Sequence, residues 1–470
     1  MPNDRRPPRP PYFRRAAARL AASRGPGATG SNPGTPPNPN RRRRPRSGKG
    51  HKIFDTISGF RGWAQHLPGN RDVVTPCVVD GRVLLGGGFG SHFFYAFDAP
   101  TGDLLWAQRT RDDGPTSAVS AEGFVVFNTE SCTVCVLRAD TGAHVWEKWL
   151  GDPLLAQPAI GGGLVFMVWP SDGKHFMSAY ELATGREVWK ARAEADVITA
   201  PVFCEGRLYA TTFDGNVHCW DAHDGTHEWG RVMRATSAPW VWKGEVFVSH
   251  WDDASPSGAH VPLETLGSVK DSYYRKRGDS KRAAYLRSRR GTPLGHSDFE
   301  KDRSVGFGSA PSSAKLHHAE SLTGASTVSR AWSFQGSRPC VWNERVYSVV
   351  GDELTASCLR SGKELWSANA RFDDEGERGI TPPVVTNGRV YAGTRDGRIL
   401  SWDAESGEPR WKVDIGTQVV WQPVVSGGQV FVGCQGGKLV ALSTEDTSDD
   451  GWPMWGGGPG HNGEVRAADP

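Results

Sequence analysis

A short glycine and tryptophan motif recurs along most of the chain and limits the folds that it can adopt. In each copy a turn ends in glycine, and a tryptophan follows within one short strand. The copies are spaced by roughly 40 residues, which is the period of a repeat protein built from small β-sheets. The interval from Trp229 to Trp332 is much longer, and it predicts an insertion within one repeat. The repeated tryptophans are Trp63, Trp106, Trp146, Trp189, Trp229, Trp332, Trp366 and Trp411.

Residues 390–411 are the clearest copy of the repeat. Residues 390–392 have strand character, and Asp396-Gly397 predicts a tight hairpin turn of the primed type, in which both residues have positive φ. Residues 399–402 form the predicted returning strand, and residues 408–411 begin an outer strand. Each repeat is therefore expected to contribute one small antiparallel sheet.

A second element lies between successive tryptophans and begins with proline. Proline is tolerated at the first residue of a strand, so each copy is expected to open a short inner strand. The expected inner hairpins begin near Val78, Val119, Ala159, Val202, Val241, Val341, Val384 and Val424.

The last inner hairpin lacks an outer strand, whereas residues 54–63 form an outer strand without a hairpin. We therefore expect an all-β, eight-bladed propeller of four-stranded antiparallel blades, with its ring closed by the N-terminal outer strand. Closure of this kind removes exposed sheet edges. Residues 451–455 are an alternative last strand.

The repeats resemble the pyrroloquinoline-quinone-like (PQQ-like) β-propeller repeat family. Residues 214–229 and 396–411 match its pattern of Asp-Gly, then aspartate, glycine and tryptophan, most closely, and residues 452–463 resemble a segment that often flanks bacterial propellers. The resemblance implies that each repeated tryptophan docks between neighbouring blades. Proteins with this style of repeat include quinoprotein dehydrogenases and the propeller subunit of the bacterial outer-membrane assembly machinery.

The dehydrogenases of this family use a pair of adjacent cysteines and a bound Ca²⁺ beside the quinone. The present chain has eight cysteines but no two in succession. We therefore expect a non-enzymatic propeller that acts as a protein-binding scaffold and needs no cofactor. A PQQ-dependent oxidoreductase is the alternative.

In the family geometry, the loops that lead into the inner strands line a central funnel. Polar and aromatic residues there suit hydrogen bonding and stacking with a ligand or peptide, although a plugged channel is the simpler interpretation. The candidate binding residues are Gln157, Thr199, Trp240, Arg338, Thr381, Trp421 and Gln422.

Three segments depart from the repeat, and two of them are basic. Residues 1–52 form a predicted disordered Pro/Arg/Gly-rich tail with 14 lysines and arginines and a single acid, Asp4. The expected propeller spans residues 53–463, and residues 464–470 form a C-terminal tail. An insertion at about residues 252–315 contains a second basic stretch.

The insertion and the basic tail could contact an anionic partner through counterion release and stacking. A solvated loop is the alternative. The candidate contacts in the insertion are Arg275, Lys276, Arg277, Lys281, Arg282, Tyr285, Arg289 and Arg290.

Other chemistry-bearing residues fit the repeat. Cys77, Cys219, Cys340 and Cys434 align with small or apolar core positions, and Cys132 and Cys135 lack a second pair that would complete a zinc site. His218, His223 and His227 form a polar surface turn or, less simply, part of a metal site.

The compartment is predicted from the cysteines and the N-terminus. Free thiols and the lack of an apolar signal segment predict a cytoplasmic protein without a membrane span, acting as a monomer or as a subunit of a complex. A misassigned start would allow export to the periplasm.

Overall fold

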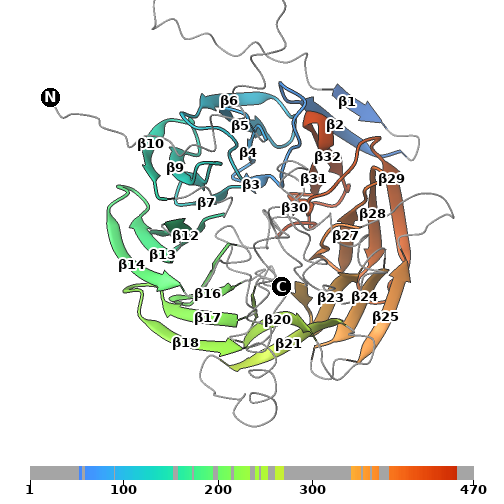
Figure 1. Cartoon of the computed structure of the whole chain (residues 1–470). Coiled ribbons are helices and arrows are strands. Elements are labelled where there is room, and N and C mark those ends of the chain that lie inside the picture. The colour runs from blue at the N-terminus through green and yellow to red at the C-terminus, as the bar shows by residue number, and fades with distance from the viewer. Residues whose placement is uncertain are drawn as a thin grey trace, which may run out of the picture. The chain divides into compact units, whose positions relative to one another are not determined.

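The computed structural model describes residues 52–55, 59–88, 90–151, 157–171, 174–193, 200–212, 216–232, 239–242, 245–251, 260–268, 340–350, 353–359, 363–369 and 380–451. The chain divides into two units, Met1–Arg46 and Ser47–Pro470, and every described residue lies in the second. Within that unit the described strands form eight antiparallel sheets, six of which have four strands. Figure 1 shows these sheets arranged around a common centre.

Each four-stranded sheet follows the chain from an inner strand to an outer strand. Four of these sheets come from the first half of the chain. They are β3 (Cys77–Val79), β4 (Arg82–Gly86), β5 (Phe93–Asp98) and β6 (Leu104–Arg109); β7 (Val119–Ala121), β8 (Phe124–Phe127), β9 (Thr133–Arg138) and β10 (His144–Trp149); β11 (Ala159–Gly161), β12 (Leu164–Ser171), β13 (Lys174–Glu181) and β14 (Glu187–Ala193); and β15 (Val202–Cys204), β16 (Arg207–Thr211), β17 (Asn216–Asp221) and β18 (His227–Val232).

The remaining sheets follow the same plan, with two exceptions in strand number. The complete ones are β22 (Cys340–Trp342), β23 (Arg345–Val350), β24 (Glu353–Cys358) and β25 (Glu364–Asn369); and β26 (Val384–Thr386), β27 (Arg389–Gly393), β28 (Arg398–Asp403) and β29 (Pro409–Asp414). The described strands β19 (Trp240–Trp242), β20 (Glu245–Trp251) and β21 (His260–Ser268) form a three-stranded sheet. β21 lies within the segment expected as an insertion.

The C-terminal strands and the N-terminal strands share one sheet of five strands. Its order is β1 (Lys52–Asp55), β2 (Arg61–His66), β32 (Lys438–Ser443), β31 (Gln429–Gly433) and β30 (Val424–Ser426). A short 3-10 helix, Gln435–Gly437, connects β31 to β32. In the register, Trp63 lies opposite Ala441, so residues far apart in the sequence pair directly. The alternative strand at residues 452–455 lies outside the described residues.

The predicted inner hairpins are confirmed, with a correction to the turn chemistry. Each expected start corresponds to a three-residue inner strand, from β3 to β30. Asn387 and Gly388, between β26 and β27, have φ of 48° and 67°, so this inner turn has the primed geometry. Of the pair expected to form a primed turn, Asp396 and Gly397, only Gly397 has positive φ, at 91°. A four-residue turn there is closed by the N–H of Gly397, which donates to the carbonyl of Thr394 at 3.2 Å.

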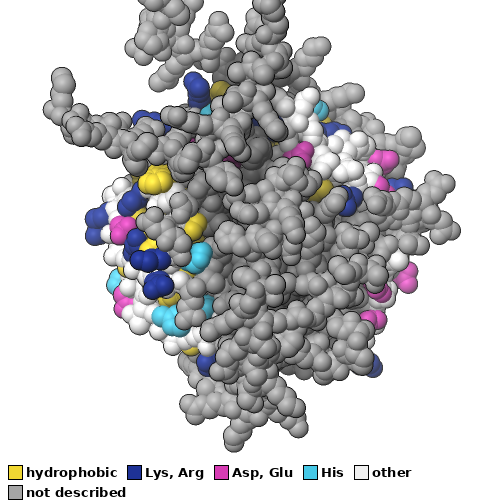
Figure 2. Space-filling view, in the orientation of Figure 1, with side chains coloured by type: hydrophobic (Ala, Val, Ile, Leu, Met, Phe, Trp, Pro, Cys, Tyr) yellow, Lys and Arg dark blue, Asp and Glu magenta, His cyan; other side chains and the backbone are white. Residues whose placement is uncertain are grey.

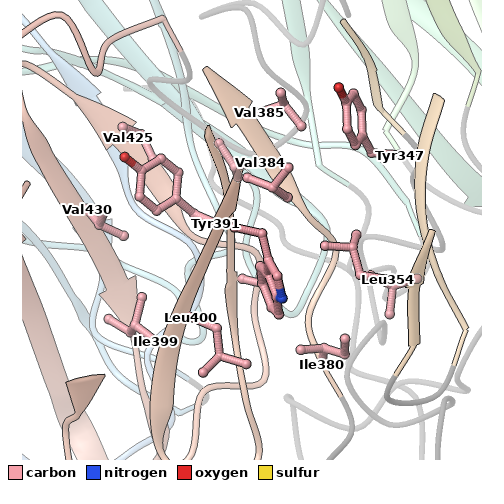
Figure 3. Packing of buried hydrophobic residues seen from close by; sticks show 14 of the residues in the cluster. Tyr347, Leu354, Ile380, Val384, Val385, Tyr391, Ile399, Leu400, Val425 and Val430 are labelled. Atoms are coloured by element: carbon pink, nitrogen blue, oxygen red, sulfur yellow. The ribbon is translucent and has the colours of Figure 1, made fainter. Parts of the chain in front are cut away.

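Apolar residues of neighbouring sheets meet face to face and form the core. Figure 3 shows one such layer, in which Tyr391 of β27 points toward Val425 of β30 and Val430 of β31 in the following sheet. All three are fully buried. The inner strands of successive sheets also contact one another: β3 with β7, β7 with β11, β11 with β15, β19 with β22, β22 with β26, β26 with β30 and β30 with β3.

Five of the repeated tryptophans dock on the following sheet, as the resemblance implied. The indole Nε1 of Trp63, Trp106, Trp146, Trp189 and Trp366 donates to the carbonyl oxygen of Ala99, Ala139, Leu182, Ala222 and Ala404 at 2.8, 3.2, 2.8, 2.9 and 3.2 Å. Each ring also covers a glycine of the same turn. A Cβ added at Gly102, Gly142, Gly185, Gly225 or Gly407 would lie 2.5 or 2.6 Å from an atom of that ring. The glycine and the tryptophan of the motif therefore belong to different contacts, one with each neighbouring sheet.

Two glycines of one sheet distinguish the effect of the docking contact on stability from the effect of the turn's backbone geometry. Gly388 and Gly407 have φ of 67° and 75°, but only Gly407 lies against a tryptophan. We predict that Gly388→Ala lowers the free energy of unfolding by about 1 kcal/mol, which is the cost of positive φ. Gly407→Ala should lower it by about 3 kcal/mol, because its Cβ also displaces the Trp366 ring. Urea denaturation measures both, and equal losses would contradict the docking role.

Candidate functional site

The loops that lead into the inner strands hold the residues expected to line the funnel. Gln157, Thr381, Trp421 and Gln422 are described, and all four are buried, with at most 3% exposure. Trp240 begins β19, and its side chain is not described. Thr199 and Arg338 lie outside the described residues.

One of these residues, Gln422, connects neighbouring sheets. The Nε2 amide of Gln422 donates to the carbonyl of Pro383 at 2.9 Å, and the Gln422 carbonyl accepts from the hydroxyl of Thr75 at 2.9 Å. Thr381 Oγ1 accepts from the N–H of Gly393 at 2.9 Å. Trp421 packs with Val74 and Val420 in a small apolar cluster. These contacts connect the start of β30 to the strands on both sides.

Gln157 differs from the other described funnel candidates. Its Oε1 is buried and has no hydrogen-bond partner among the described residues, and the same is true of the hydroxyl of Ser117 before β7. An unpaired buried amide oxygen costs free energy unless a partner supplies a donor. Gln157 is therefore a described funnel residue with capacity left to bind another group.

The basic candidates cannot be placed in this geometry. Residues 275–290 of the insertion and residues 1–51 of the basic tail lie outside the described part of the chain. Arg275, Lys276, Arg277, Lys281, Arg282, Tyr285, Arg289 and Arg290 therefore remain predictions from the sequence.

An acidic loop cluster, which the sequence analysis missed, joins the first two four-stranded sheets. Glu130, in the loop between β8 and β9, accepts a hydrogen bond from the N–H of Gly90 at 2.7 Å. Asp112 accepts from the hydroxyls of Thr129 and Ser131 at 2.6 and 3.0 Å. The pKa of Glu130 is raised to about 7, mainly by burial and in part by the charges of Asp113 and Asp112, while the hydrogen bond from Gly90 and the charge of Arg71 oppose the shift. No repeat position marks these residues, because loop residues vary from blade to blade.

A second missed cluster follows β32. Asp449 is fully buried, and its carboxylate accepts hydrogen bonds from Arg389 at 2.5 Å, the hydroxyl of Tyr391 at 2.7 Å and Asn387 at 3.0 Å. At the corresponding place one sheet earlier, the hydroxyl of Tyr347 donates to the carbonyl of Ala404. The last sheet lacks that turn, and a carboxylate takes the place of its carbonyl. Burial, followed by the bond to Asp449, raises the pKa of Tyr391.

The described cysteines lie mainly in the core, and so does His218, which the sequence placed in a surface turn. All eight cysteines are free thiols, and seven of them are buried. Burial raises the pKa of Cys77 and of Cys434 to about 12, so both are protonated at neutral pH. His218 Nδ1 lies 3.2 Å from His227 Nε2. Within the described residues, no three His, Cys, Asp or Glu side chains are grouped closely enough to hold a metal ion.

Antiparallel four-stranded sheets around a centre, joined by docked tryptophans, define a β-propeller of the PQQ-like repeat class. The family model described as outer membrane protein assembly factor BamB matches residues 91–195, 133–249 and 320–452, which together cover more than half of the chain. The chain belongs to this family.

Individual relatives agree with this assignment. The BamB of Yersinia pestis is 23% identical over 229 residues, which are 43% of this chain and 57% of that protein. The chain spans less than two thirds of the length of the curated relatives that it matches.

Two solved structures have a similar fold. The crystal structure of BamB from Moraxella catarrhalis aligns with a TM-score of 0.53 and 14% identity, covering 81% of this chain and 96% of that one. The quinohemoprotein alcohol dehydrogenase of Comamonas testosteroni aligns with a TM-score of 0.53 and 16% identity, covering 82% and 76%. At such identities these likenesses show the fold alone.

The cytoplasmic location predicted from the sequence is wrong. The matching family and relatives are named outer membrane protein assembly factors, and that name contradicts the cytoplasm. Free thiols misled the prediction, because burial in the core protects them whatever the compartment. No helix among the described residues is long and apolar enough to cross a membrane.

The raised pKa of Glu130 predicts a measurable pH dependence of stability. Ionisation is disfavoured in the folded state, so this residue stabilises the fold less as the pH rises from about 4.5 through about 7. Glu130→Gln should match the wild type in stability near pH 4.5. At pH 8 it should be more stable by about 1–2 kcal/mol, which is less than the full pKa shift corresponds to because solvent partly screens the charge.

Thermal unfolding at both pH values measures this difference. Glu408→Gln, which removes an exposed carboxylate of equal charge, is the matched control. A constant difference between Glu130→Gln and the wild type at the two pH values would contradict the effect.

Proposed function

We propose that the chain is a non-enzymatic scaffold that binds proteins in the periplasm during outer membrane protein assembly. The observation that carries this proposal is the BamB family match over more than half of the chain. The geometry supports it, because the side chain of Gln422 before β30 bonds within the fold, whereas apolar residues of outer strands such as Leu105 and Trp149 are exposed. The protein partner and the periplasmic location are inferred from the names of the relatives.

We further propose that residues 53–463 form a closed ring of eight blades. Closure is supported on both sides of the five-stranded sheet that the N-terminal and C-terminal strands share. Trp63 of β2 docks on Gly102 of the next sheet, and the Phe60 ring lies 4.7 Å from the ring of Trp411 in the preceding sheet. Pairing of β2 with β32 occupies an edge that would otherwise be open.

Closure predicts that the first tryptophan stabilises the fold as much as an internal one. Trp63→Ala should lower the free energy of unfolding by about 3–5 kcal/mol, because it removes a buried indole and its hydrogen bond. Trp106→Ala, at the same position one sheet later, is the control, with a loss of similar size. Urea denaturation compares them. A small loss for Trp63→Ala alone would indicate an open ring.

The basic segments extend the proposal to an anionic partner. The support is the charge of residues 275–290 and of residues 1–52. Lysine and arginine in such density attract polyanions by releasing counterions. The candidate residues of the funnel and of the insertion belong to this proposal as partner contacts.

The scaffold role predicts a defect in the outer membrane. Deletion of the gene in its native host should lower the amount of folded outer membrane proteins, and the wild-type chain expressed in the periplasm should restore it. A chain lacking residues 271–290 should restore it less well if the insertion contacts a partner. Quantitative proteomics of outer membranes measures the effect.

The quinoprotein dehydrogenase relationship supplies the second candidate function. It is favoured by the fold shared with the Comamonas testosteroni enzyme. Unchanged outer membrane proteins in the deletion strain, together with saturable binding of the quinone and Ca²⁺ and reduction of a dye, would replace the scaffold proposal with this one.

A further inference from the structure

The outer strand β14 presents two exposed basic residues on one face. Lys190 and Arg192 are alternate residues of the strand, so their side chains project to the same side of the sheet. They lie opposite Ser178 and Phe176 of β13. The nearby acid Glu187 already pairs with Lys148, at 3.6 Å. Within the described part of the chain, neither Lys190 nor Arg192 has an acidic partner.

Aromatic rings hold one of these charges in place. The Nζ of Lys190 lies 4.2 Å from the centre of the Trp169 ring and 3.9 Å from that of Phe176. Trp169 is itself fixed, since its Nε1 donates to the hydroxyl of Ser178 at 3.0 Å. A cation over two rings is oriented without being neutralised. Figure 2 shows lysine, arginine and hydrophobic side chains together on the side of the sheets where β10 and β14 lie.

The edge of β14 is also free to pair. Among the described strands, β14 bonds only to β13, so its outer side carries unpaired N–H and C=O groups. It has seven residues, whereas the outer strands β6, β10, β18, β25 and β29 have six each. β29 begins with proline, and its Arg410 is neutralised by Asp403 at 2.6 Å. β14 is thus the longest of these edges and carries two charges without a counter-ion.

The molecule already contains an example of strand addition at such an edge. β1 pairs antiparallel with the outer side of β2, as a fifth strand of its sheet. The register sets Asp55 opposite Arg61, so an acidic position faces a basic one. In antiparallel pairs, directly opposed residues lie on the same face and interact.

We propose that the edge of β14 binds an extended peptide segment with carboxylates at alternate positions, which adds as a fifth antiparallel strand. The acidic side chains would then meet Lys190 and Arg192, while backbone hydrogen bonds supply the remaining affinity. The intervening positions would lie on the side of Trp189 and Ala191, where small or apolar residues fit. This inference rests on the proposed scaffold function and names the class of segment that the scaffold recognises.

Two short labelled peptides of identical composition test the proposal. One alternates glutamate with valine or threonine, and the other carries its glutamates in succession. Fluorescence anisotropy with the full chain should show about tenfold tighter binding of the alternating peptide, with weakening at high salt. Lys190→Glu combined with Arg192→Glu should abolish the preference. Lys412→Glu, a change at the residue that follows the repeated tryptophan of β29 as Lys190 follows that of β14, should leave the preference unchanged.

A third peptide separates strand addition from simple charge attraction. N-methylation of its backbone at alternate residues removes donors while keeping the carboxylates, and it should weaken binding by about tenfold. Equal binding of the alternating, successive and N-methylated peptides, or of a polyanion such as polyphosphate, would overturn the proposal and leave only a surface for anions. Normal restoration of outer membrane proteins by the Lys190/Arg192 variant would show that the scaffold function holds without this edge.

Discussion

The docking of a tryptophan from one sheet onto the glycine turn of the next is the contact on which the rest of the structure depends. Each ring fills the space that a Cβ would need and donates one hydrogen bond to a carbonyl of the turn. A small four-stranded sheet cannot bury enough apolar surface alone, so stability comes from the contacts between neighbouring sheets. Those contacts also fix the angle between sheets, because the ring and the turn fit in a single orientation.

Where the repeat ends, other groups take over this contact. In the five-stranded sheet, Phe60 before β2 packs against Trp411 of the preceding sheet. Asp449 follows β32 and bonds Arg389 and Tyr391. A buried carboxylate takes the place of the turn carbonyl of Ala404, and each accepts hydrogen bonds from three donors. Asp449 thereby joins the five-stranded sheet to the sheet before it by charge as well as by packing, and removing one partner would leave a buried charge uncompensated.

A frame of this kind leaves function to its edges and loops. Inner-strand groups such as Gln422 are occupied by contacts within the fold. The outer strand β14 has an edge that no described strand pairs with and two charges without a counter-ion, and a partner can bind there. The loop of Glu130 holds a carboxyl with a raised pKa, which responds to a change of pH. Membership of the BamB family indicates the process in which the protein takes part. The chemistry of exposed edges and loops indicates which parts of the chain a partner would contact.

The sequence alone determined the repeat, the inner strands and the role of the tryptophans, because a glycine and a tryptophan at fixed spacing satisfy the same local geometry in every copy. Tertiary structure decided what the repeat cannot encode. It paired Trp63 with Ala441 across the whole chain, buried Asp449, raised the pKa of Glu130 and placed Lys190 over Trp169. These depend on which loops and faces meet in space. Single occurrences in a repeat carry no periodic signal, so the candidate site was found only in three dimensions.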